Sequence, residues 1–236
     1  MTELTINYCF DFGDRRSSFD VRVDARSLLQ HAGNQDTALP EWTRLGFHQC
    51  ANCPLTAQDT PWCPVAVNLM PLISECGGLL SYQQARVVVT TAERSYSRDT
   101  TVQRGLSSLL GLVMATSACP HMRFLRPMAK FHLPFASEEE TIFRAVSTWL
   151  LSRYFAADAD GVPALDLSGL GDSYQGLQAV NRAFAGRLKA ACGQDAAVNA
   201  VVLLDLFAKD VPYSIADRLA ELGYLFAAGA GTQREG

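Results

Sequence analysis

The sequence predicts an α+β protein, in which a small antiparallel sheet packs on a mainly helical body. Two stretches near the N-terminus alternate apolar and polar residues, as half-buried strands do. Later segments space their apolar residues three or four apart, which is the period of amphipathic helices. With 236 residues, 48% of them apolar, the chain is long enough to bury a sizeable core.

The sheet is expected from three stretches. Residues 4–12 carry an apolar side chain at every even position, and Phe19, Val21 and Val23 resume this alternation after a turn at 13–16. The pair therefore predicts a β-hairpin. The β-branched run within 86–96 predicts a third strand, which should join the hairpin because an isolated hairpin is marginal in water.

The helical body is expected from apolar stripes at helical spacing. Ser137 and Glu140 have the spacing of a capping box, and Asp172 and Asp195 precede two further stripes as helix caps. We expect 126–135 to be irregular because prolines bracket it, and the tail after Ala228 to be disordered. The segment 198–207 is apolar nearly all round and should be central. The helices are expected over 64–76, 102–117, 137–155, 172–193 and 195–207, with a last one from Ser214.

The chain has one candidate linker. Residues 156–171 contain Asp, Gly and Pro, as linkers often do. We therefore divide the chain into residues 1–157, with the hairpin, the cysteine loop and a helical core, and residues 158–236, a C-terminal helical subdomain. The two parts could also form one continuous domain.

Composition narrows the possible functions. A formal net charge of −4 argues against a dedicated nucleic-acid-binding protein. The longest apolar run, 105–119, is too short to span a bilayer, and the N-terminus lacks the pattern of a signal peptide. Seven cysteines without an export signal indicate reduced thiols or metal ligands rather than disulfides. We therefore expect a cytoplasmic protein.

The strongest chemical signal is a set of four cysteines. Cys50 and Cys53 form a Cys-x2-Cys pair, which can hold one metal ion across a tight turn, and Cys63 follows in the same loop. Cys119 lies far downstream, where a predicted helix stops before Pro120. We predict that these four thiols form a structural zinc site, with Cys63 favoured as a thiolate by the helix that follows it.

Three alternatives stay open. The cysteines could ligate an iron–sulfur cluster, since three of them precede proline, although their spacing matches neither ferredoxin pattern. They could be ordinary buried thiols, because free cysteine is among the most buried residue types. The fourth ligand could be His48 or His121 instead of Cys119.

A second hypothesis is an enzyme or a redox or ligand sensor with an anion pocket beside the cysteines. Basic residues gather in the sequence around 94–132, and Arg126, Lys130 and His132 would hold an anionic ligand there. The competing interpretation is that these are solvated charges and a buried histidine. The sequence contains no known catalytic motif, and the protein partner and substrate stay open. The apolar C-terminal helices suggest a homodimer.

Several of these motifs carry a family resemblance. The stretches are 47–55, 63–69, 112–120 and 126–135, with 181–184 in support. Together they resemble an uncharacterised bacterial, mainly proteobacterial, family defined by a domain of unknown function, and the resemblance covers most of the chain. It implies no activity. Ala51 and Pro71 depart from the family pattern, where proline and a helix former are expected.

Overall fold

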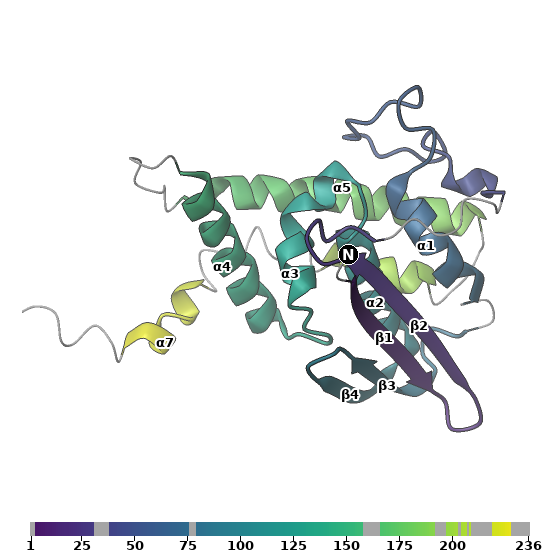
Figure 1. Ribbon diagram of the computed structural model, residues 1–236, viewed down its shortest axis with the longest axis horizontal. Helices are drawn as coiled ribbons and strands as arrows, with labels where there is room; N and C mark the ends of the chain where they lie inside the picture. The colour runs from purple at the N-terminus through teal and green to yellow at the C-terminus, as the bar shows by residue number, and fades with distance from the viewer. Residues whose placement is uncertain are drawn as a thin grey trace, which may run out of the picture.

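The computed structural model has a four-stranded antiparallel sheet beside a larger helical body, which confirms the α+β class (Figure 1). It describes residues 3–30, 38–75, 79–157, 166–191, 197–202, 204–206, 208 and 219–227. The elements are β1 (Glu3–Asp11), β2 (Arg16–Asp24), the 3₁₀ helix η1 (Glu41–Thr43), α1 (Pro64–Glu75), β3 (Gln84–Thr90), β4 (Ser95–Thr101), α2 (Val102–Ala115), the 3₁₀ helix η2 (Pro120–Leu125), α3 (Arg126–Lys130), α4 (Glu138–Ala156), α5 (Ser168–Ala191) and α7 (Tyr224–Ala227).

The strand order is β2-β1-β3-β4, with every neighbouring pair antiparallel. The predicted hairpin is confirmed, and Tyr8 of β1 lies opposite Phe19 of β2. The third predicted strand joins β1 as expected. The prediction of a single strand over 86–96 was wrong, because the chain turns at Thr91–Arg94 and returns as β4.

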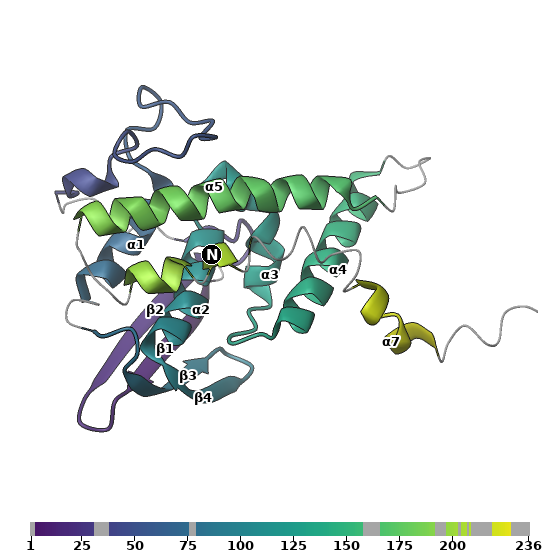
Figure 2. The same ribbon diagram turned by 180° about the vertical axis from the view of Figure 1, so that it is seen from behind.

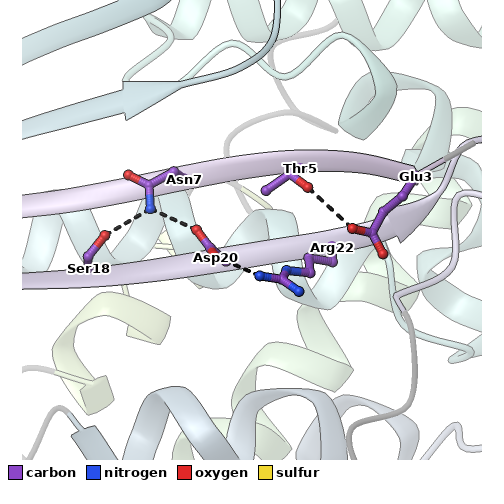
Figure 3. A network of polar contacts seen from close by, with 6 residues as sticks. All are labelled: Glu3, Thr5, Asn7, Ser18, Asp20 and Arg22. Carbon is purple, nitrogen blue, oxygen red and sulfur yellow. Dashed lines mark hydrogen bonds and ion pairs between the residues drawn. The ribbon is translucent and has the colours of Figure 1, made fainter.

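The two faces of the hairpin follow its alternation. Ile6, Tyr8 and Phe10 of β1 are buried on one face, together with the apolar residues of β2 and β3. On the other face, Figure 3 shows a polar network in which Asn7 donates hydrogen bonds of 2.8 Å to both Ser18 and Asp20. This polar face leaves only one side of the sheet to be covered by helices.

Helix α2 covers the apolar face of the sheet, and α1 packs against α2 (Figure 1). The approach is close at Gly105 of α2, where a Cβ atom would lie 2.6 Å from the Phe10 ring and 3.0 Å from Val87. A hydrogen atom in place of a side chain is therefore what lets α2 reach the sheet. Helix α1 begins at Pro64, as predicted, and continues through Pro71.

The capping box that begins α4 is confirmed, since Ser137 and Glu140 exchange side-chain and backbone hydrogen bonds. The expectation of an irregular segment over 126–135 was wrong in its first half, because η2 and α3 occupy 120–130. Their prolines stand at the first helical positions, which need no backbone N–H. Helix α5 begins at Ser168, so Asp172 lies inside it and is not its cap.

The C-terminal predictions are tested only in part. Residues 197–202 are helical and bury Ala200 and Val201, but Val202 and Leu206 are exposed, so this segment is not surrounded by protein on every side. The predicted cap at Asp195, the helix start at Ser214, the helix end at 77–78 and the tail after Ala228 lie outside the described residues.

One hydrophobic cluster includes buried residues of the sheet, of α1, α2 and α4, and of α5. Helix α5 runs along the back of the molecule and packs on η1 and η2 (Figure 2). The division at residues 157 and 158 stays a prediction. In the described part of the chain, no helix combines the length and apolar character needed to cross a bilayer.

Candidate metal centre

Cys50 and Cys53 lie at the two ends of one turn in the loop between η1 and α1. The backbone N–H of Cys53 donates to the carbonyl oxygen of Cys50 over 3.0 Å, which closes the turn. Both side chains are half-buried and reach the same cavity. The Cys-x2-Cys spacing therefore produces two thiols that converge on one point.

Hydrogen bonds between the two ends of the loop bring Cys63 to the same cavity. Its N–H donates to the carbonyl oxygen of Thr43 over 2.8 Å, and Leu45 donates to the carbonyl oxygen of Pro61 over 2.9 Å. Cys63 directly precedes α1, and its own carbonyl oxygen accepts from Val67 in the first turn of the helix. The positive end of the α1 dipole therefore lies next to this thiol.

Cys119 reaches the cavity from another part of the chain. It follows the end of α2 and directly precedes η2, and it is buried. The backbone N–H groups of His121 and Met122 lie close enough to its sulfur to lower its pKa, against the larger effect of burial. The preceding backbone is held by Arg126, whose guanidinium donates to the carbonyl oxygen of Ser117 over 3.0 Å. Donors of this kind stabilise a sulfur that carries negative charge.

The four thiols line one small cavity, which we call the thiol cavity. Its volume is about 20 Å³, which is room for about one water molecule. No carboxylate lines it. The other residues of its wall are Leu45, Leu55, Pro64, Val65, His121, Val180, Phe184 and Arg187.

Two of the four thiols have raised pKa values in this arrangement. Burial, and the proximity of Cys63, Cys53 and Cys119, raise the pKa of Cys50 to about 12. Burial also raises the pKa of Cys119 to about 11, with Cys63 and Cys53 adding to the shift. In the part of the chain that the structure describes, no group of three or more His, Cys, Asp or Glu side chains is arranged to hold a metal ion as it stands. A metal ion would have to displace the thiol protons and draw the sulfurs together.

Arg187 of α5 is the one charged side chain on the wall of the thiol cavity. It is only 2% exposed. Its guanidinium donates to the backbone carbonyl oxygens of Trp42 (2.6 Å), Arg44 (2.7 Å) and Leu45 (3.2 Å). Within the described residues it forms no ion pair with a carboxylate. Burial lowers the pKa of Arg187, and the neighbouring Cys63, Cys50 and Cys53 oppose that shift.

Helix α5 is also tied to the cysteine turn through Asn52. The Asn52 side chain donates to the carbonyl oxygen of Gly176 over 3.0 Å, and its backbone carbonyl oxygen lies 2.8 Å from Nε2 of His121. A Cβ atom at Gly176 would lie 3.2 Å from Nδ1 of His121, so the glycine gives this ring its space.

A family model for a domain of unknown function, DUF6901, matches residues 5–227. The chain belongs to the DUF6901 family. The match includes all four cysteines of the thiol cavity, and it confirms the resemblance to an uncharacterised family that the motifs suggested. No curated protein and no solved structure matches the chain.

In this DUF6901 chain, the two histidines named as alternative ligands have other contacts. His121 borders the thiol cavity, but its two ring nitrogens lie against the Asn52 carbonyl oxygen and the Gly176 backbone. His48 does not line the cavity, and its ring lies 5.1 Å from that of Phe47. Among the candidates for a fourth ligand, Cys119 is therefore the one whose sulfur faces the other three.

The three residues predicted to hold an anion lie in different surroundings. Arg126 bonds to the backbone beside Cys119. His132 is buried against Tyr8, and Lys130 is exposed. Their joint role in one pocket stays a prediction.

Sequence reasoning missed Arg187 and Asn52, which join α5 to the cysteine loop. Arg187 had a detectable signal, because it continues the apolar stripe of Val180 and Phe184 at helical spacing. A charged residue on an apolar stripe indicates a buried partner. The identity of that partner, more than a hundred residues away, has no local signature.

Proposed function

We propose that this protein binds one zinc ion through Cys50, Cys53, Cys63 and Cys119, and that the ion has a structural role. The observation that carries the proposal is the buried Arg187 guanidinium on the wall of the thiol cavity, for which the described residues provide no carboxylate partner. A buried charge is costly unless an opposite charge compensates it. Four thiolates outweigh the two positive charges of Zn²⁺, so the metal centre would supply the missing negative charge.

The size and chemistry of the cavity support a single soft ion. Thiolates suit Zn²⁺, whereas Mg²⁺ and Ca²⁺ require oxygen ligands, and none of the wall residues is a carboxylate. A cavity of about 20 Å³ accommodates one ion more readily than an iron–sulfur cluster, which brings several iron and sulfide atoms with it.

The connectivity supports a structural role. With all four ligands supplied by the protein, a zinc ion has no open position for substrate. The ion would join the cysteine loop, the start of α1 and the start of η2 at one point, and α5 would close over it through Arg187. We infer a zinc-stapled cytoplasmic protein with a regulatory or interaction role.

The test is the metal content of protein purified without added metal or chelator, together with its absorption spectrum. We expect close to one zinc per chain and no visible colour. After exchange into Co²⁺, the protein should show the intense visible bands of tetrahedral cobalt–thiolate coordination. A brown protein that contains iron and sulfide would instead support the cluster.

The matched variants are Cys119→Ser and Cys9→Ser. Cys9 is also a free, half-buried cysteine, but it lies on β1 and does not line the thiol cavity. We expect Cys119→Ser to lose zinc and the cobalt spectrum, and Cys9→Ser to keep both. Equal metal content in the two variants, or none in the parent protein, contradicts the proposal.

A further inference from the structure

A second, larger cavity lies beside the thiol cavity and has no part in the proposed zinc site. It measures about 400 Å³, within the range of roughly 300–1,000 Å³ typical of small-molecule sites. Helices η2, α3, α4 and α5 form its walls, and Figure 1 shows these elements meeting at one side of the molecule. We call it the Arg123 pocket. Its lining residues are Pro120, His121, Arg123, Phe124, Pro127, Met128, Ala145, Thr148, Trp149, Ser152 and Ser173.

The aromatic walls of the Arg123 pocket are held in place by contacts outside it. The Trp149 indole N–H donates to the carbonyl oxygen of Asp166 over 2.9 Å, and the ring lies against Gly169, where a Cβ atom would be 2.8 Å away. Phe124 packs edge-on against the buried Tyr174, with ring centroids 5.4 Å apart. Two fixed rings give a flat apolar or aromatic ligand a pre-formed surface.

The polar side of the pocket is positively charged. Arg123 lines it, and no acidic residue does. In the part of the chain that the structure describes, the Arg123 guanidinium forms no ion pair. Arg126 lies close enough for the two charges to oppose each other, since Arg123 adds to the lowering of the Arg126 pKa that burial causes. An arginine on the lining, with no carboxylate among the lining residues, favours an anion.

We propose that the Arg123 pocket binds a small organic acid, with its carboxylate at Arg123 and its apolar or aromatic body between Phe124 and Trp149. The hydroxyl groups of Ser152 and Ser173 already donate to the carbonyl oxygens of Trp149 (2.7 Å) and Gly169 (2.8 Å). Their oxygens therefore face a ligand only as acceptors. Arg123 is the charged group of the lining that can pair with an anion. The proposal does not depend on zinc.

The test compares 3-phenylpropionate with its neutral amide and with inorganic phosphate, by isothermal titration calorimetry at low ionic strength. We expect the acid to bind with a Kd below roughly 1 mM and the amide at least about tenfold more weakly, because it cannot form a charge-assisted bond. Phosphate should also bind more weakly, because it leaves the apolar walls unfilled.

Two arginine variants carry the same change in charge. Arg123→Gln should remove the preference for the acid over the amide, whereas Arg153→Gln, on α4 but outside the pocket lining, should preserve it. Ser152→Trp, which adds bulk at an exposed position of the lining, should abolish binding of both ligands. Zinc content should stay the same in all three variants, which separates this result from the fate of the metal proposal.

The assignment is overturned if the acid does not bind, if the amide or phosphate binds equally well, or if Arg123→Gln leaves the preference intact. If the Ser152→Trp variant still binds the acid, the acid binds elsewhere on the protein, and the assignment is likewise overturned.

Discussion

Two regions of the molecule can be compared: the sheet end, which is β1–β4 with α2, and the cysteine end, which is the loop before α1 with η2 and α5. At the sheet end, buried polar groups bond to one another. At the cysteine end, a buried cation lies beside four thiols. Tyr8, which is fully buried under the sheet, has its hydroxyl 2.8 Å from Ser108 and 2.5 Å from Nε2 of His132. Among the described residues, Arg187 at the other end donates to neutral carbonyl oxygens and forms no ion pair. The buried polar groups at the sheet end therefore pair with one another, whereas the described part of the cysteine end offers its cation no carboxylate.

This difference predicts where an added ion matters. The sheet end is stabilised by apolar burial against α2, which requires no ligand. The loop that carries Cys50 and Cys53 has little regular structure. It is held by backbone hydrogen bonds at Thr43 and Leu45 and by hydrogen bonds that the Arg187 side chain donates to its carbonyl oxygens. Local stability should therefore respond to metal removal at one end only.

The largest effect is expected from removal of the metal. A ligand present at about 1,000 times its Kd stabilises the native state by about 4 kcal/mol, and a chain of this size shifts its Tm by about 2–4 °C per kcal/mol. Chelation should therefore lower the Tm by about 10 °C, measured by calorimetry. Hydrogen exchange should show lost amide protection around Cys50, Cys63 and η2 and unchanged protection in β1. An equal loss of amide protection in both regions would contradict this prediction.

The next effect concerns Arg187. Replacement by Gln removes the cation and leaves buried carbonyl oxygens without donors, at a cost of about 3 kcal/mol in unfolding free energy. Loss of this outer-shell partner should also weaken zinc affinity about 10–100-fold, measured by competition with a chromogenic chelator. The control is Lys189→Gln on the same helix, whose side chain is exposed. It should cost under about 1 kcal/mol and leave zinc affinity unchanged.

A smaller effect, at the sheet end, is a dependence on pH. Burial, followed by the positive charge of Arg144, lowers the pKa of His132 from 6.5 to about 3. Because the unfolded chain takes up a proton below pH 6.5 and the folded protein does not, stability should be complete above pH 6.5 and fall as the pH drops towards 3. The loss at pH 5 is about 2 kcal/mol.

Urea unfolding of the parent protein and of His132→Gln at pH 7 and pH 5 measures this term. The difference between the two proteins should shrink on acidification, since the variant lacks the titrating group. Tyr8 and Arg144 keep their charge states between pH 5 and pH 7, so they add no pH dependence of their own to the comparison. A parent and variant that lose stability in parallel would show that His132 is not the group responsible.

The smallest effect tests close packing of α2 on the sheet. Gly105→Ala places a methyl group 2.6 Å from the Phe10 ring, and should destabilise the protein by about 1–2 kcal/mol despite a better helix propensity. Gly111→Ala on the same helix meets its nearest neighbour, Leu204, at 3.4 Å, which is an ordinary contact. It should be neutral or stabilising by up to about 1 kcal/mol. Equal effects at both positions would contradict the close approach at Gly105.

Local sequence patterns correctly predicted strands and helices that bury one face and expose the other. The hairpin follows from the alternation in β1 and β2, and the α4 start follows from Ser137 and Glu140. Strand β4 was missed because it is an edge strand with one buried residue, Thr100, and so carries no apolar alternation. Helices η2 and α3 were missed because Pro120 and Pro127 were interpreted as breaks, although proline is well tolerated in a first helical turn.

In the candidate site, too, local sequence patterns predict some residues and not others. Cys50 and Cys53 were predicted as ligands because metal-ligand spacing is local, and Cys119 because it lies at a helix end, and the structure places all of them on one cavity. The pairing of Arg187 with the cysteine loop depends on how α5 packs, and no short pattern encodes it. Arg123 was noticed as one of many basic residues, but its place in a pocket depends on the positions of four separate elements.

The contribution of α5 to the thiol cavity has a consequence for synthesis on the ribosome. The four cysteines emerge from the exit tunnel before Arg187 is translated, because α5 lies C-terminal to all of them. A nascent chain that captures zinc at that stage would hold its centre with excess negative charge until α5 arrives. Docking of α5 would then reduce that charge, so a ribosome stalled before α5 should carry a metal that exchanges more readily than in the finished protein.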